Sequence, residues 1–137
     1  MKTILIATAS AAALATAALA QPQSSVVRAE DLKWTGAGIA GVSTAVVDGD
    51  IAKGASRFYL RYAAGFVAPV HYHSADHRVT TVTGTLVLIV DGKEHRLAPG
   101  SYFALLGKAL HAARCDGAQD CVMFIDARSP WDVVPAP

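Results

Sequence analysis

The amino-acid sequence predicts an all-β fold, a sandwich or barrel of short antiparallel strands. Short apolar segments recur along the 137 residues, and Gly, Pro or Asp separates each segment from the next. No segment beyond the N-terminal leader carries the 3.6-residue apolar period of an amphipathic helix. The pair Asp91-Gly92, between LVLIV and KEHRL, is a strong signal for a two-residue hairpin turn. These observations predict a single domain in which no helix is required.

Residues 1–20 form a leader in which one lysine, Lys2, precedes an apolar, alanine-rich run. The run ends in Ala18-Leu19-Ala20. A basic start, an apolar middle and small residues at the end predict a secretory signal peptide cleaved after Ala20. A retained membrane anchor is the alternative, which the shortness of the run disfavours. We therefore expect a periplasmic or secreted protein.

The rest of the chain divides into a polar lead-in at 21–33, one domain at 34–134 and a tail at 135–137. Cleavage removes Lys2 from the 12 Lys and Arg residues, which leaves 11 basic and 11 acidic residues. This balance, without any run of like charge, argues against nucleic acid and against a membrane surface as partners. Trp131, in the irregular stretch near the C-terminus, is expected to pack across the outside of the barrel.

Nine segments are expected to form strands, because each is short, rich in β-branched or aromatic residues and bounded by turn residues. They are residues 43–47, 57–62, 67–73, 79–83, 85–90, 94–97, 102–105, 109–115 and 122–126. The stretch TGAGIAGV after Trp34 is expected to be a glycine-rich loop. Phe58, Leu60 and Tyr62 alternate with more polar residues, which predicts one buried face on that strand.

The two cysteines, Cys115 and Cys121, bracket the loop DGAQD between two expected strands. An exported protein meets an oxidising compartment, so we predict a disulfide bond at the neck of a hairpin. In the alternative, Cys115 faces inward with His111, four residues earlier, and is a thiolate ligand of a metal ion.

Three histidines fall within seven residues of the segment GFVAPVHYHSADHRVTTVTG, residues 65–84. Side chains two residues apart on a strand point to the same face, so His71 and His73 would project together. If the chain turns at SADH, His77 on the return strand faces the same space. Three convergent imidazoles suit a first-row transition metal.

The same segment resembles the first motif of the cupin superfamily, whose spacing is matched by Gly65, His71, His73, position 77 and Gly84. Glutamate is usual at position 77, where this chain has histidine. A looser second motif follows in DGKEHRLAPGSYFALLGKALHAARC, and His111 falls at the family's last metal-binding histidine. The resemblance spans residues 34–134 and implies an antiparallel cupin-type β-barrel, also called a double-stranded β-helix or jelly roll.

The resemblance further implies a metal ion held by His71, His73, His77 and His111. In a second arrangement, three of these are ligands and His77 is a hydrogen-bond donor behind them. Imidazole ligands leave Fe, Mn, Cu, Ni and Zn as candidates and disfavour Mg and Ca. Either set leaves coordination positions open for a substrate or dioxygen. His95, a lone histidine between charged neighbours, is interpreted as a surface residue.

Residues that share the parity of the histidines on their strands are candidates for the lining of a pocket. They are Val79, Thr81 and Thr83; Phe58, Leu60 and Tyr62; and either Tyr102 with Ala104 or Phe103 with Leu105. Such a lining would be mostly apolar with a few hydroxyls. For the aliphatic members, ordinary core packing is the favoured interpretation.

Two functions follow from the resemblance. In the first, the protein is a small metalloenzyme with dioxygenase- or isomerase-like chemistry, an oxidoreductase in the former case, acting on a small organic molecule. In the second, it is a non-catalytic exported protein that uses the same metal site to hold a small ligand or the metal itself. The sequence has no GxSxG, HExxH, CxxC or phosphate-binding glycine loop that would indicate another chemistry. A homodimer is expected by resemblance, since cupins commonly pair through edge strands.

Overall fold

The computed structural model describes residues 24–137, and the predicted signal peptide lies outside them. The described chain contains one 3-10 helix and eleven strands, which form two antiparallel sheets. The elements are η1 (Ala29–Asp31), β1 (Thr35–Gly36), β2 (Val42–Gly49), β3 (Ser56–Tyr62), β4 (Val67–Tyr72), β5 (His77–Thr83), β6 (Thr85–Val90), β7 (Lys93–Leu97), β8 (Tyr102–Leu105), β9 (His111–Asp116), β10 (Cys121–Ala127) and β11 (Val134–Pro135). In residues 24–137, no helix has the length and apolar character needed to cross a membrane.

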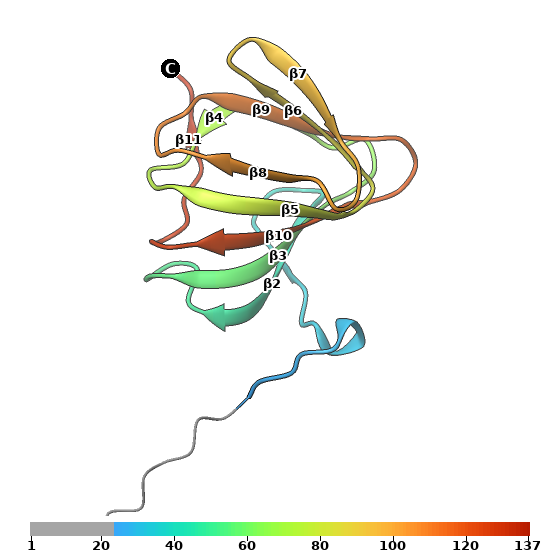
Figure 1. The fold of residues 1–137 in the computed structure, drawn as a ribbon, viewed down its shortest axis with the longest axis vertical. Coiled ribbons are helices and arrows are strands. Elements are labelled where there is room, and N and C mark those ends of the chain that lie inside the picture. The colour runs from blue at the N-terminus through green and yellow to red at the C-terminus, as the bar shows by residue number, and fades with distance from the viewer. Residues whose placement is uncertain (1–23) are drawn as a thin grey trace, which may run out of the picture.

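The six-stranded sheet has the order β1-β2-β3-β10-β5-β8, and the five-stranded sheet has the order β11-β4-β9-β6-β7. Figure 1 shows the two sheets stacked, with β10, β5 and β8 in one layer and β4, β9, β6 and β7 in the other. Neighbours that are distant in sequence, such as β3 and β10, pair antiparallel over seven residues. This arrangement confirms the predicted all-β jelly-roll fold with one domain.

All nine predicted strands are present, as β2 to β10, and each end lies within two residues of its predicted position. The sequence did not predict β1 and β11, which contain two residues each. The expectation of an uninterrupted loop after Trp34 is therefore wrong at Thr35–Gly36, which pairs with β2. Strands of two residues show no period-2 alternation, so their pairing partners alone define them.

The core lies between the two sheets, where inward residues alternate with outward ones. Every second residue of β10 is buried, which gives the pattern expected for a strand with one face on a core. The largest fully buried side chains are Phe58, Met123, Ile125, Val87, Thr81, Cys115 and Cys121. The predicted buried face of β3 is confirmed for Phe58 and Leu60, which are 0% and 7% exposed.

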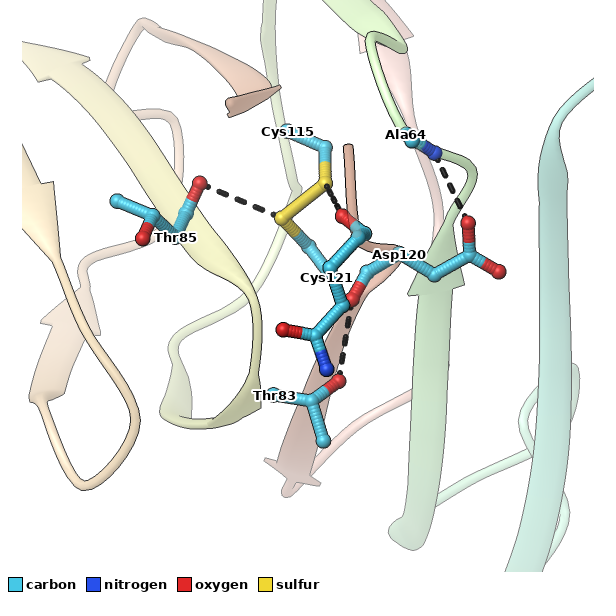
Figure 2. Close-up of a disulfide and its surroundings, with 7 residues drawn as sticks. Ala64, Thr83, Thr85, Cys115, Asp120 and Cys121 are labelled. Atoms are coloured by element: carbon cyan, nitrogen blue, oxygen red, sulfur yellow. Dashed lines mark hydrogen bonds between the residues drawn. A yellow bond between two sulfur atoms is a disulfide. The ribbon is translucent and has the colours of Figure 1, made fainter. Parts of the chain in front are cut away.

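The predicted disulfide bond joins Cys115 at the end of β9 to Cys121 at the start of β10, with a Cα–Cα distance of 5.5 Å. Figure 2 shows the bond beside Asp120, whose carboxylate accepts a 3.0 Å hydrogen bond from the Ala64 N–H. The Asp120 carbonyl also accepts a hydrogen bond from the Thr83 hydroxyl at 3.1 Å. The bond excludes the alternative in which Cys115 is a thiolate ligand, and it lies at the closed end of the β9–β10 connection.

Candidate metal centre

Four histidines are buried between the sheets, and three strands position them. His71 lies on β4 opposite His111, the first residue of β9, and the two are a cross-strand pair. His73 follows the end of β4, and His77 is the first residue of β5. Their exposed fractions are 5%, 5%, 6% and 3% for His71, His111, His73 and His77. The four imidazoles therefore share one interior space, as the first motif predicts for His71, His73 and His77 and the family resemblance implies for His111.

A β-bulge in β4 aims His71 at His111. The register advances three residues on β4, from Ala68 to His71, against two on β9, from Ala113 to His111. One extra residue in a strand bends it and changes the direction of the following side chains. Pro69, inside this irregular part, has no N–H to contribute to the ladder, and its carbonyl accepts a 2.7 Å hydrogen bond from His71 Nδ1.

Each of the four imidazoles donates a hydrogen bond from Nδ1 to a backbone carbonyl. The acceptor is Pro69 for His71, at 2.7 Å, Ala109 for His111, at 2.9 Å, Ala75 for His77, at 3.4 Å, and Asp132 for His73. A carbonyl can only accept, so the Nδ1 nitrogen must carry the proton. In the neutral ring Nε2 is then unprotonated and free to bind a metal ion.

Three of the histidines form a compact donor group. One ring nitrogen from each of His71, His73 and His111 lies within 4.8 Å of those of the other two. His77 is outside this group, although its ring centroid is 4.5 Å from that of His73. The compact group thus contains three of the four residues that the resemblance implies as ligands. Direct ligation by His77 stays a prediction.

Burial favours the neutral form of three of these imidazoles, those of His73, His77 and His111. The loss of solvation lowers the pKa of His73 to about 3 and that of His77 to about 4, and repulsion from neighbouring imidazolium charges acts in the same direction. Burial also lowers the pKa of His111. A neutral imidazole is the form that binds a metal ion, so at neutral pH these three rings need not lose a proton to do so.

The histidines face a small inner cavity of about 30 Å³, which has room for about one or two water molecules. Apart from the histidines its lining is apolar or aromatic, and it consists of Leu60, Tyr62, Val79, Leu86, Leu88, Phe103, Leu105, Ala113, Met123, Ile125 and Trp131. Among the predicted wall residues, Leu60, Tyr62 and Val79 are confirmed, and Phe103 with Leu105 is the pair that faces inward. Thr81, Thr83, Tyr102 and Ala104 do not line it, and Phe58 is in the core.

Trp131 was expected on the outside of the barrel, and that expectation is wrong. Its ring centroid lies 4.0 Å from that of His73 and 4.6 Å from that of His77. It also meets Phe58 edge-on at 5.3 Å. The backbone N–H of Trp131 donates a 2.8 Å hydrogen bond to the Ile51 carbonyl, which fixes the backbone at this point. The C-terminal segment thus enters the mouth of the barrel and covers the histidines.

Asp132 is a site residue that the sequence did not reveal. Its backbone carbonyl accepts the hydrogen bond from His73 Nδ1, and its carboxylate accepts hydrogen bonds from the N–H and the hydroxyl of Ser74. The segment continues into β11, which pairs with β4. Residues 131–135 therefore form a strap that orients one imidazole of the donor group. The contact spans 59 residues of sequence, so no local motif could have indicated it.

A larger outer cavity of about 640 Å³ adjoins the inner one, and Leu60, Tyr62, His71, His73 and Trp131 line both. It lies between the β1–β2 edge of one sheet and the β4–β11 edge of the other. Two imidazoles of the donor group thus form part of the wall of a space large enough for a small organic molecule.

Comparison with known proteins agrees with the fold. The family model described as "Cupin domain" matches residues 58–126. No curated protein sequence matches the chain.

Three similar solved structures show the same fold. KdgF from Halomonas sp. is 18% identical with a TM-score of 0.64, over 77% of this chain and 94% of that one. The polyketide cyclase RemF from Streptomyces resistomycificus is 17% identical with a TM-score of 0.69, over 84% and 87%. An RmlC-like cupin from Shewanella frigidimarina is 21% identical with a TM-score of 0.62, over 76% and 88%. At such identities the likeness concerns the fold.

Proposed function

The chain belongs to the cupin superfamily, and from its histidine cluster we propose that it is a metal-binding cupin that acts as a small metalloenzyme on a small organic molecule. One observation carries the proposal. Three imidazoles, each with Nδ1 engaged by a carbonyl, place a ring nitrogen in one compact group at the junction of two cavities. Structural zinc sites, by contrast, are closed by four protein ligands.

The donor group fits a divalent transition metal. Its members are nitrogen donors without a carboxylate, which suits Fe, Mn, Cu, Ni or Zn and not Mg or Ca. His71, His73 and His111 would hold the ion, with His77 either as a fourth ligand or as a neighbour of His73. A bound ion would supply Lewis-acid or redox chemistry of the dioxygenase or isomerase type.

The protein's own residues would fix the geometry and exclude water. The carbonyls that hold Nδ1 of the imidazoles orient the rings before any ligand binds, so little rotamer entropy is lost on binding. Trp131, with the aliphatic residues of the inner cavity, keeps the space around the rings apolar. A substrate in the outer cavity would meet His71 and His73 directly, because both line that cavity.

A second function is a non-catalytic binding protein with the same metal site. The outer cavity's lining favours it in one respect, because Asp132 is the one carboxylate among its residues and bonds to Ser74. Because this carboxylate is already engaged, any proton transfer to or from a substrate would have to use a group of the substrate itself or a water molecule. In either function we propose export through the predicted signal peptide, with small molecules as partners and neither nucleic acid nor membrane. A homodimer is also proposed.

The metal site can be tested by elemental mass spectrometry on protein purified without a histidine tag. We expect about one equivalent of a transition metal in the wild type and a loss of most of it in His71→Ala and His111→Ala. The matched control is His95→Ala, because His95 is exposed on β7 and lies outside the donor group. Unchanged metal content in His71→Ala and His111→Ala would refute the proposal.

Oxygen-uptake and isomerisation screens of the metal-loaded protein then separate the two functions. Turnover that His71→Ala abolishes, while His95→Ala retains it, supports the enzyme. Stoichiometric metal and small-molecule binding without turnover in either screen would favour the binding protein.

A further inference from the structure

The outer cavity has a composition that restricts which ligand it can accept. Its volume of about 640 Å³ falls within the roughly 300–1,000 Å³ of small-molecule sites. Most of its lining is aliphatic or aromatic, including Ile39, Val42, Ile51, Phe66, Val70 and Val133. An apolar surface of this kind stabilises a ligand by removing apolar area of both partners from water.

Among the described residues that line the cavity there is no lysine or arginine, so the side chains alone offer no cation to an anionic group. Asp132 is the one acidic residue in the lining, and its carboxylate is negative. Burial raises the pKa of Tyr62 to about 12, so its phenol stays neutral. In the metal-free protein, a carboxylate or phosphate of a ligand would lose water there without a compensating ion pair.

Two polar side chains of the outer cavity, His71 and His73, also line the inner cavity, and Trp131 adds a flat apolar surface beside His73. Most of the other lining residues are apolar, and Thr44, Tyr62 and Asp132 are the exceptions. A ligand that matches this distribution has an apolar body and one polar end.

We propose that the outer cavity binds a neutral, largely apolar small molecule, of the aromatic-alcohol or aromatic-ketone type, with its oxygen toward His71 and His73. The inference names the substrate class of the proposed site and in that respect rests on the proposed function. The proposed ligand is neutral. In this respect it differs from the substrates named for two proteins of similar fold, a sugar phosphate isomerase from Silicibacter pomeroyi and an oxalate oxidase, which are anionic.

Isothermal titration calorimetry tests the proposal by measuring the affinity of three matched probes. The probes are 2-naphthalenemethanol, 2-naphthoate and 2-naphthyl phosphate. The titrations use the protein as purified and the same protein after chelator treatment. We expect the alcohol to bind the chelator-treated protein at least about tenfold more tightly than either anion, because without a metal ion only the anions bury an uncompensated charge. Equal or tighter binding of an anion by the chelator-treated protein, or no binding of the alcohol by either sample up to its solubility limit, would overturn the proposal.

A lysine introduced into the cavity wall tests whether the probes bind in the outer cavity. Val70 lines the cavity and is 49% exposed, so Val70→Lys adds a cation without disturbing the core. We expect 2-naphthoate to gain about fivefold in affinity in Val70→Lys. Val82→Lys is the control, because Val82 is 41% exposed on β5 and does not line the cavity. The same gain in both variants would place the binding elsewhere and refute the proposal.

Two further measurements separate the ways in which the proposals can fail. A dimer that Val70→Lys dissociates, together with no binding of the alcohol, would assign the cavity to a second copy of the chain and overturn the inference. Metal content, measured on the same samples, tests the proposed function independently. Tight binding of the alcohol by metal-free protein would leave the ligand class supported even where the metal site fails.

Discussion

The stability of the metal-free protein should fall steeply between pH 7 and pH 5. Unfolded histidines take up protons near pH 6.5, whereas His73 and His77 in the folded protein have pKa values of about 3 and 4. Between these values the unfolded state binds more protons than the folded state, so acid favours unfolding. The contribution of the two rings is complete above pH 6.5 and is lost as the pH falls below it.

The expected loss follows from these pKa values. Lowering the pH from 7 to 5 costs roughly 2 kcal/mol for each ring by proton linkage, or about 4 kcal/mol for both. The lowered pKa of His111 adds to the loss in the same direction. Four kcal/mol is a large part of the roughly 5–15 kcal/mol that stabilises a typical domain. The carboxylates titrate mainly below pH 5, which leaves the histidines dominant in this interval.

Urea unfolding in the presence of a chelator measures the effect. With a urea m-value of about 1–3 kcal/mol/M, the midpoint should fall by about 1–4 M between pH 7 and pH 5. His77→Gln should remove about half of the dependence, while His95→Gln should leave it intact, because His95 is exposed. A metal-free protein that is equally stable at both pH values would show that burial does not hold these rings neutral.

Three other perturbations have defined outcomes. Reduction of the Cys115–Cys121 disulfide should lower the free energy of unfolding by about 2 kcal/mol, measured by urea unfolding with and without reductant. Alkylation without reductant should label neither cysteine, and labelling of both would contradict the bond. Phe58→Ala should cost about 3–5 kcal/mol in the same assay, because the ring is fully buried, and a loss below about 1 kcal/mol would argue against that packing. Asp132→Ala should weaken metal binding roughly tenfold or more by loosening the strap at His73, whereas Asp31→Ala, in the exposed helix η1, should leave it unchanged.

The sequence predicted most of the fold because the strands that build it are long enough to carry a signal. Strand β6 is a continuous apolar run that ends at Asp91-Gly92, and both of its ends are where the turn residues place them. Asp91 has a φ of 51°, in the left-handed region that such a two-residue turn requires. In contrast, β11 pairs two residues with β4, and nothing local distinguishes Val134–Pro135 from coil.

The candidate site was predicted to the extent that its members share a motif. His71, His73 and His77 converge because strand parity and one turn bring them together, and His111 was placed by the family resemblance. Trp131 and Asp132 could not be predicted, since they reach the histidines through tertiary contacts of a segment with no periodicity. The choice of Phe103 over Tyr102 for the cavity wall depended on a register that only the pairing of β5 with β8 fixes.

The acceptors of the four Nδ1 protons lie at unequal distances along the chain. His71, His77 and His111 each donate to the carbonyl two residues earlier, so their orientation is encoded within a three-residue unit of strand or turn. His73 instead donates to a residue 59 positions later. Contacts of long sequence separation form late, since their loop-closure entropy is recovered only when the intervening chain is ordered. Three rings are thus oriented by their own strands and turns, whereas the orientation of His73 requires residues 131–135 to be docked.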